Sequence, residues 1–503
     1  MRKIPSTMAT QHPDNAAAPY WERDGDGFVS SLEEVEESMS SFRDLGAEEF
    51  MWDWEGRHAD EAVIDKFFYG YRDFFKRRQL GKDVFLTFRL PNIWHEKGYG
   101  LLRALLVILT SEDFARDLKF HYPPLFEVIL PLTERAEQLI YIERSFRKLA
   151  RFKSQAFDHF SYRNNEHLQV IPLLEGIEHQ IGVGKLLREY VRMHARYFRA
   201  RPRSLRVFLA RSDPALVSGL PATMIANKIA LSEMRSFTKE TGIPVFPIIG
   251  VGSLVFRGGL SPASCKEFIK EYAGVKTVTI QSAFRYDYPL LQVKRAIAYL
   301  NRHLPATRAR VIPPNEIQKL HKLAKKFETA YQTTLAGVIR DVEPLFGAVP
   351  ARRERRLHVG FLAYQRRMGA LSLPRAINFT AAFYSLGIPP EFIGTGVTLK
   401  RLTDKERSLL EKYYVNIKSN LIEAGKYLNK ENVKKLAQHN RNWNKIMEDI
   451  VQIEKIFGVI LGPQTAREKK HYQLAKRLLP LLRNRKKATF LITASGILRR
   501  SLG

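Results

Sequence analysis

Short hydrophobic runs alternate along this chain with longer amphipathic segments. The segments at 59–78 and 133–152, for example, place apolar residues three and four positions apart, which predicts helices. Uninterrupted apolar runs that alternate with helices are typical of parallel strands buried on both faces. Eight such runs occur, at residues 49–54, 84–90, 126–132, 168–175, 205–213, 244–252, 275–282 and 357–365. Eight strand–helix units predict an α/β protein with a (β/α)8 barrel of the TIM type.

The later part of the chain has a different pattern. The interval between the seventh and eighth runs is mostly helical in its periodicity, and beyond about residue 400 this periodicity continues almost to the end. We therefore expect residues 1–400 to form the barrel together with the N-terminal segment. We expect residues 401–503 to form a helical extension that packs on the barrel, as part of one structural unit.

The charge of the chain is large and unevenly distributed. Lys and Arg number 81 against 52 Asp and Glu, a formal charge of +29, and 45% of residues are hydrophobic, which indicates a folded and basic protein. Residues 1–60 carry 14 acidic and 5 basic side chains, whereas residues 464–503 carry 11 basic side chains and one acidic. The basic character therefore belongs to the later segments.

A basic chain could bind nucleic acid, because Lys and Arg neutralise phosphates. The sequence contains no zinc finger, basic-region zipper or pair of RNP-type aromatic motifs. The C-terminal charges are interleaved with apolar residues at helical spacing, which is typical of a solvated amphipathic face: Leu474, Leu478, Leu481 and Leu482. We keep nucleic-acid binding as an alternative and do not expect a nucleic-acid partner.

The single cysteine, Cys265, excludes an intramolecular disulfide and a thiolate metal cluster. The N-terminus lacks the apolar region of a signal peptide, and no stretch approaches 18 uncharged apolar residues. We expect a cytoplasmic protein with no membrane partner.

Polar residues follow several predicted strands, at the end of a barrel where chemistry collects. Glu175 and Asp213 end neighbouring strands, and a pair of carboxylates suits Mg²⁺ or Mn²⁺ with water and substrate oxygens completing the shell. Further polar residues at strand ends are Asp53, Glu55, Arg89, Arg211, Ser212, Arg257, Gln281, Arg285 and Arg366. Because guanidinium groups bind phosphate and carboxylate bidentately, the set predicts a phosphorylated, carboxylate-bearing substrate.

Each of these residues taken alone has an ordinary structural interpretation. A single Arg or Glu at a strand end is commonly a solvated rim residue, and the Gly250–Gly252 pair is more often a turn than a phosphate cradle. The convergence of five or more such residues at one end of one barrel favours a site. His12 has no predicted strand beside it, so its spacing alone indicates only a surface residue.

Several segments, in order along the chain, resemble the archaeal-type phosphoenolpyruvate carboxylases. The N-terminal STMATQHPDN at 6–15 is similar to the signature of that family. The other matching segments are EFMWDWEG (49–56), FRLPN (88–92), VIPLLE (170–175), RSDPALVSG (211–219), GVGSLVFRGGLSP (250–262), TIQSAFRYDY (279–288) and LPRAINFTAAFYSLGIPPEFIGTG (373–396). The resemblance implies a barrel enzyme, usually a homotetramer, that uses Mg²⁺ or Mn²⁺ to join phosphoenolpyruvate and bicarbonate into oxaloacetate and phosphate.

The resemblance also implies roles for individual residues. His12 is similar to the catalytic histidine of the family, and Glu175 and Asp213 to its metal ligands. Arg257 resembles the arginine of the glycine-rich loop, where Gly258 and Gly259 would let the backbone approach the substrate. Further arginines implied at the active site are Arg89, Arg366 and Arg375. Arg211 and Arg285, which follow predicted strands, are substrate-binding candidates by their position.

Two positions depart from the family pattern or leave its alignment open. The longer family members have a lysine just after the Ser-Asp pair, where this chain has Pro214, Ala215 and Leu216, so Arg211 is a candidate for the missing cation. The neighbouring Arg367 leaves the register of Arg366 open.

The implied reaction also predicts how the site should behave. We expect the glycine-rich segment 250–262 to close as a lid, because water would protonate the enolate of pyruvate. A metal-dependent lyase or aldolase of the phosphoenolpyruvate/pyruvate barrel type is an alternative that needs neither bicarbonate nor His12.

Overall fold

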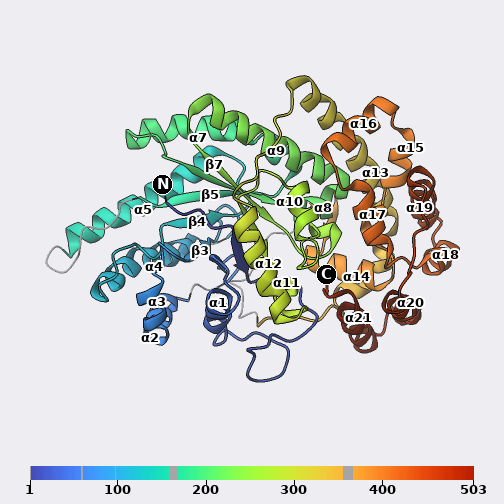
Figure 1. Cartoon of the computed structure of the whole chain (residues 1–503), viewed down its shortest axis with the longest axis horizontal. Coiled ribbons are helices and arrows are strands. Elements are labelled where there is room, and N and C mark those ends of the chain that lie inside the picture. The colour runs from blue at the N-terminus through green and yellow to red at the C-terminus, as the bar shows by residue number, and fades with distance from the viewer. Residues whose placement is uncertain (1, 58–59, 97, 158–166, 355–365) are drawn as a thin grey trace.

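The computed structural model describes residues 2–57, 60–96, 98–157, 167–354 and 366–503. Among these residues, eight parallel strands close into a barrel in chain order (Figure 1). They are β1 (Thr7–Thr10), β2 (Glu49–Asp53), β3 (Phe85–Arg89), β4 (Glu127–Leu130), β5 (Gln169–Leu174), β6 (Leu205–Ala210), β7 (Val245–Gly250) and β8 (Thr277–Ile280). The predicted α/β barrel is confirmed.

The strand that closes the barrel is not the one the hydrophobic pattern indicates. Seven of the predicted strands correspond to β2–β8, but β1 takes the remaining place and pairs with both β2 and β8. Met8 lies beside Glu49 on one side and Thr279 on the other. The predicted strand at 357–365 falls outside the described residues, and the barrel closes without it. With four residues, two of them threonine, β1 is too short to show an apolar run.

The inside of the barrel is filled in layers that alternate strands contribute. The layer at the amino ends of the strands is polar, with Arg206 donating to Glu49 at 2.7 and 2.8 Å, to Glu127 at 3.0 Å and to Thr277 at 3.0 Å. The next layers are apolar: Met8, Met51, Ile129, Ile171, Phe208 and Ile248. Side chains alternate along a strand, so every second residue points into the barrel. Beyond the apolar layers, at the carboxyl ends of the strands, the residues that face inward include polar ones.

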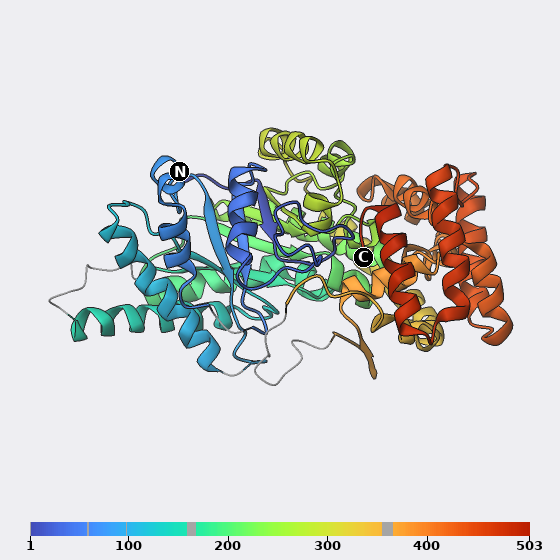
Figure 2. The same cartoon turned by 90° about the horizontal axis from the view of Figure 1, so that it is seen from below.

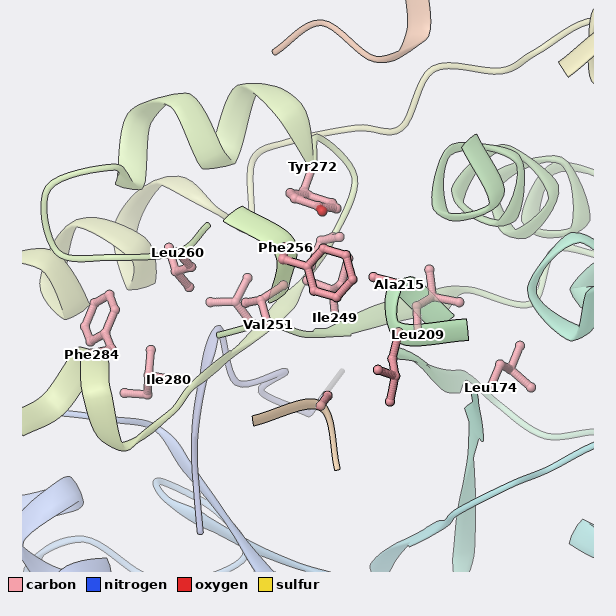
Figure 3. Packing of buried hydrophobic residues seen from close by; sticks show 14 of the residues in the cluster. Leu174, Leu209, Ala215, Ile249, Val251, Phe256, Leu260, Tyr272, Ile280 and Phe284 are labelled. Atoms are coloured by element: carbon pink, nitrogen blue, oxygen red, sulfur yellow. The ribbon is translucent and has the colours of Figure 1, made fainter. Parts of the chain in front are cut away.

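Helices surround the barrel and bury its outer face (Figures 1 and 2). Their bounds are α1 (Glu34–Arg43), α2 (Val63–Gly70), α3 (Arg72–Arg77), α4 (Gly98–Asp117), α5 (Ala136–Ala156), α6 (Ile177–Ile181), α7 (Val183–Phe198), α8 (Ser212–Ser218), α9 (Leu220–Thr241), α10 (Cys265–Glu271), α11 (Ser282–Tyr286) and α12 (Leu290–His303). A short 3₁₀ turn, η1 (Val255–Arg257), follows β7. In the core beside it, Phe256 lies among Ala215, Ile249 and Val251 (Figure 3).

The rest of the chain forms a mainly helical part on one side of the barrel (Figure 2). The long helix α13 (Pro314–Phe346) packs on α8 and α9 and so joins the two parts. The elements that follow are β9 (Arg366–Met368), β10 (Leu371–Leu373), α14 (Ala376–Ser385), η2 (Pro390–Phe392), α15 (Thr395–Arg401), α16 (Asp404–Tyr413), α17 (Ile417–Gly425), α18 (Lys430–His439), α19 (Trp443–Phe457), α20 (Ala466–Leu478), η3 (Leu479–Leu481) and α21 (Arg485–Arg499). The expected additional helices are present, and the division at residue 400 stays a prediction. Within the described ranges, every helix is too short or too polar to cross a membrane.

The buried charges below the apolar layers give a test of how the barrel is stabilised. Arg206→Leu leaves Glu49 and Glu127 buried beside an apolar side chain, and breaking such a buried pair typically costs about 3–5 kcal/mol. We expect denaturant unfolding to show a loss of that size. As a control, Lys325→Leu removes a half-exposed lysine that pairs with Glu178 and Glu328, and a surface pair is worth about 1 kcal/mol or less. Equal losses in the two variants would contradict a stabilising role for the Arg206 cluster.

Candidate active site

A cavity of about 430 Å³ opens at the carboxyl ends of the barrel strands. The barrel side of its lining includes Gln11, His12, Asp53, Glu55, Arg89, Glu175, Arg211, Ser212, Asp213, Gly250, Arg257 and Gln281. The helical part supplies the facing wall: Phe346, Gly347, Val349–Ala351, Arg353, Arg375–Asn378 and Arg485. The structure thus brings together most of the residues that the sequence places at strand ends.

His12 lies two residues beyond β1 and reaches the cavity because β1 closes the barrel. Its Nδ1 is 2.9 Å from the hydroxyl oxygen of Thr10, which fixes the orientation of the ring. Burial, reinforced by the positive charges of Arg89 and Arg257, lowers the pKa of His12 to about 3. The imidazole is therefore neutral at physiological pH, the protonation state that a general base requires.

Arg89, at the end of β3, is held by two carboxylates. Its Nε donates to Asp53 Oδ1 at 2.8 Å, and its Nη1 lies 2.7 Å from Glu55 Oε2. Burial alone would raise the pKa of Asp53, but the Arg89 guanidinium outweighs it and holds that pKa well below its usual range. The charge of Arg89 is thus largely balanced before any anion enters the cavity.

Arg257 is almost fully buried, with 1% of its surface exposed, and four polar groups hold its guanidinium. It donates to Asp14 at 3.0 Å and to Ser212 at 3.3 Å, and also to the Gln281 side chain and the Gly503 carbonyl oxygen. Burial lowers the pKa of Arg257, and the Asp14 carboxylate opposes that shift. This places a fixed positive charge in the cavity wall.

The glycine-rich segment is part of the wall of the cavity. Gly252 N–H donates to the Arg257 carbonyl at 2.8 Å, and Leu260 N–H donates to the Gly252 carbonyl at 3.1 Å. Gly258 has a φ of +125°, and a Cβ there would come within 2.4 Å of Val251. Gly258 and Gly259 are absent from the cavity lining and instead form the turn after Arg257, so substrate contact by these two residues stays a prediction.

Of the two substrate-binding candidates Arg211 and Arg285, only Arg211 lines the cavity. Arg211 lines the cavity, but its Nε donates to the Tyr272 hydroxyl at 3.1 Å and its Nη1 to the Phe256 carbonyl at 3.3 Å. Whether it replaces the lysine of the longer enzymes stays a prediction.

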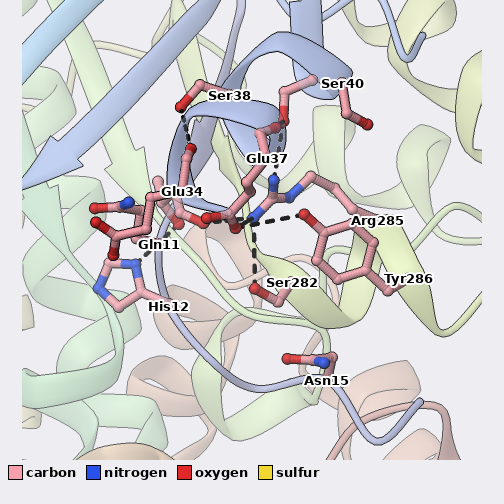
Figure 4. A network of polar contacts seen from close by, with 12 residues as sticks. Gln11, His12, Asn15, Glu34, Glu37, Ser38, Ser40, Ser282, Arg285 and Tyr286 are labelled. Atoms are coloured by element: carbon pink, nitrogen blue, oxygen red, sulfur yellow. Dashed lines mark hydrogen bonds and ion pairs between the residues drawn. The ribbon is translucent and has the colours of Figure 1, made fainter. Parts of the chain in front are cut away.

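Arg285 does not line the cavity. It points from α11 toward α1 and donates to Glu37 at 2.9 Å, to Ser41 at 2.9 Å and to the Thr10 carbonyl at 2.7 Å (Figure 4). Arg285 thus links α11 to α1 and to the end of β1, and substrate contact by this residue stays a prediction.

Two further predicted arginines come from the helical part. Arg375 immediately precedes α14 and lines the cavity. Arg366 begins β9, but its side chain lies outside the part of the chain that the structure describes, so its role stays a prediction.

The two predicted metal ligands follow adjacent strands and line the same cavity. Glu175 comes directly after β5, and Asp213 lies in the first turn of α8 after β6. Among the described residues, no group of three or more His, Cys, Asp or Glu side chains is arranged to hold a metal ion. Two carboxylates are a donor set that fits Mg²⁺, which usually binds one or two carboxylates and keeps oxygens from water and substrate.

The sequence interpretation missed the arginines that reach the cavity from outside the strand ends. Arg353 follows α13 and donates to Glu34 at 3.0 Å and to Glu37 of α1. Arg57 also binds Glu34, at 2.8 Å. Arg485 is exposed at the start of α21. In the sequence, Arg353 and Arg485 lie in charged runs that look solvated, so no local signal distinguishes them.

Comparison with known proteins decides the family. A family model described as phosphoenolpyruvate carboxylase matches residues 4–503. This chain belongs to the phosphoenolpyruvate carboxylase family. A phosphoenolpyruvate carboxylase of Leuconostoc mesenteroides is 44% identical over 478 residues, which cover 95% of this chain and 94% of that protein. The similarity to the family that the motifs indicate is confirmed.

Two other phosphoenolpyruvate carboxylases cover nearly the whole chain. That of Oenococcus oeni is 43% identical, covering 100% of this chain and 99% of its own length. That of Metallosphaera sedula is 35% identical, covering 97% of this chain and 96% of its own length. The family match therefore includes the barrel and the helical part together.

Proposed function

We propose that this chain joins phosphoenolpyruvate and bicarbonate to form oxaloacetate and phosphate. The observation that carries the proposal is the meeting of His12, Arg257, Arg375 and the Glu175–Asp213 pair in one cavity. The family match and the printed name of the relatives support the same reaction. An aldolase or lyase on this barrel would need the carboxylates and an arginine, but would have no need for His12 in the cavity.

The cavity suits substrates with several negative charges. Arg257 and Arg375 bind the phosphate and carboxylate groups, since guanidinium forks match both. Glu175 and Asp213 would hold a divalent ion, Mg²⁺ or Mn²⁺, which would supply a positive charge to stabilise developing negative charge on the substrate. The arginines offset the charge that spreads over the phosphoryl group as it is transferred.

The reaction proceeds in two halves. An oxygen of bicarbonate attacks phosphorus, and the bond to the enol oxygen breaks, which gives carboxyphosphate and the enolate of pyruvate. Neutral His12 accepts the carboxyl proton of carboxyphosphate, whose C–O bond to the phosphate then breaks to release CO₂ and phosphate. The proton passes from His12 to the released phosphate, which restores the neutral imidazole. The enolate carbon attacks CO₂ and forms the new carbon–carbon bond of oxaloacetate.

Water must be kept from the enolate, because protonation would give pyruvate. The wall from the helical part covers the open end of the barrel and brings apolar side chains, including Phe346, Val349 and Ile377, to the cavity. This wall excludes water from the cavity until the enolate carbon has attacked CO₂.

The enzyme is proposed to be a cytoplasmic homotetramer. Its one cysteine, Cys265, is buried and free, which fits a reducing compartment. Sedimentation of the purified chain is expected to give a species of four chains, well above the mass of 58.0 kDa of one chain. An active enzyme that sediments only as a monomer would refute the assembly.

The metal site is tested by Asp213→Asn, which keeps the size of the side chain and removes one charge. We expect Mn²⁺ binding, measured by titration calorimetry, to weaken by about 100-fold or more. Loss of a residue that only supports a metal ligand already weakens metal binding by about 10- to 100-fold. Asp404→Asn changes an exposed aspartate on α16 and should leave Mn²⁺ affinity unaltered. Unchanged affinity in Asp213→Asn would remove this residue from the metal site.

The role of His12 is tested by the products of His12→Asn. If His12 acts after carboxyphosphate has formed, the variant still releases phosphate in a bicarbonate-dependent way, but the enolate is protonated to pyruvate. Oxaloacetate formation should fall by about 10²–10⁴-fold, the usual contribution of a general base. Coupled assays with malate and lactate dehydrogenase measure the two products. His321→Asn, at a partly exposed position on α13, is the control, and oxaloacetate made at its rate by His12→Asn would contradict the proposal.

A further inference from the structure

The backbone of Phe256, the residue before Arg257, is held on both sides by charged side chains. Its N–H donates to Glu391 Oε1 at 2.7 Å. Its carbonyl oxygen accepts from Arg211 Nη1 at 3.3 Å. Glu391 comes from η2 in the helical part, whereas Arg211 follows β6 of the barrel. The two parts of the molecule therefore meet on a single residue of the glycine-rich segment.

These contacts fix the direction in which Arg257 leaves the backbone. The Phe256 carbonyl, bound by Arg211, and the Arg257 N–H, which donates to the Leu254 carbonyl at 2.9 Å, belong to one peptide plane. The Phe256 N–H, bound by Glu391, belongs to the preceding plane, whose Val255 carbonyl accepts from the Gly258 N–H at 2.9 Å. Because both planes that meet at the Phe256 Cα are hydrogen-bonded, the φ and ψ angles of Phe256, the two soft dihedrals of the residue before Arg257, are restrained. On the other side of the residue, the Phe256 ring packs near Tyr331 and Phe379, with centroids at 6.5 and 5.7 Å.

Glu391 occupies a position that is unfavourable for a carboxyl group. It is fully buried, and burial raises its pKa to about 7. Oε1 also accepts from the Tyr384 hydroxyl, while Oε2 has no hydrogen-bond partner within the described residues. A buried acidic group costs stability unless hydrogen bonds compensate for it, and the bond from the Phe256 N–H is one of the two that Oε1 accepts from neighbouring residues.

We propose that Glu391 is a positioning residue that acts through the Phe256 backbone to aim Arg257 into the cavity. The inference rests on the proposed function in one respect, namely that Arg257 binds the anionic substrate. Glu391 does not line the cavity, so it is placed to act through other residues. In this arrangement the helical part completes the active site by setting the conformation of a barrel loop, in addition to forming one wall.

The test compares substitutions that differ only in their reach to the Phe256 N–H. Glu391→Asp shortens the side chain by one methylene, and Glu391→Met keeps its length but removes the acceptor. Each should lower kcat/KM for phosphoenolpyruvate by about a hundredfold, since a misplacement of about 1 Å can have that effect. Glu391→Gln retains an acceptor oxygen and should recover most of the activity. Tyr384→Phe removes the other bond to Oε1 and leaves the Phe256 contact in place, so it serves as the matched control.

Two readouts separate positioning from a general effect on folding. Hydrogen exchange at the Phe256 amide should quicken in Glu391→Asp and Glu391→Met but stay slow in Glu391→Gln and Tyr384→Phe. In a double-mutant cycle, Glu391→Asp should have little further effect on kcat/KM once Arg257→Lys is present. Effects that multiply independently, or an unchanged Phe256 exchange rate in folded Glu391→Asp, would overturn the proposal.

The proposed function can fail without this inference failing. If the unaltered enzyme forms no oxaloacetate from phosphoenolpyruvate and bicarbonate, the reaction is wrong. The exchange of the Phe256 amide then still decides whether Glu391 holds the backbone. Calorimetry of phosphoenolpyruvate binding to Glu391→Asp then decides whether Glu391 positions Arg257. Weakened affinity for phosphoenolpyruvate supports that role, and unchanged affinity contradicts it.

Discussion

The site depends on the insertion of one four-residue strand, β1, between β2 and β8. Its hydrogen bonds close the barrel and leave neither β2 nor β8 with an open edge. Bonds on both sides of β1 then hold the chain: Val278 N–H donates to the Ser6 carbonyl at 2.9 Å, and Ala283 N–H donates to Asp14 at 2.7 Å. A residue between these anchors, such as His12, has little freedom. The position of the proposed base is therefore a consequence of barrel closure.

Charge balance is the second constraint on the cavity. The protein carries a formal charge of +29, yet several arginines that line the cavity are paired with carboxylates: Arg89 with Asp53, Arg257 with Asp14, and Arg353 with Glu34 and Glu37. Buried charges require such partners, because removing a charge from water costs free energy that only an opposite charge and hydrogen bonds can offset. The large surface charge is thus a separate property from the chemistry of the cavity, and the anionic substrate meets arginines whose positions are already fixed.

The sequence was informative where local pattern determines structure. Strands β2–β8 are apolar enough to be recognised in the sequence. Because the carboxyl ends of parallel strands meet at one end of a barrel, the sequence alone could place Glu175 and Asp213 together. β1 could not be found in this way, because its own residues do not form an apolar run. It is buried by β2 and β8, and β8 is distant in the sequence. The contacts of Arg285 with α1 could not be predicted for a related reason: strand-end position does not reveal which face of the following helix a side chain occupies.

The helical part is integral to the site, and the contacts around Asp14 explain why. Asp14 binds Arg257 from the glycine-rich segment, and its carbonyl accepts from the Leu502 N–H at 2.7 Å. Arg499, at the end of α21, in turn holds the Leu502 carbonyl and the Ser385 hydroxyl of α14. A displacement of the last helix would therefore reach Asp14, two residues from His12, without touching the cavity lining. The same logic applies to Glu391 and Phe256, so two independent contacts make the conformation of the barrel loops depend on the helices packed beside them.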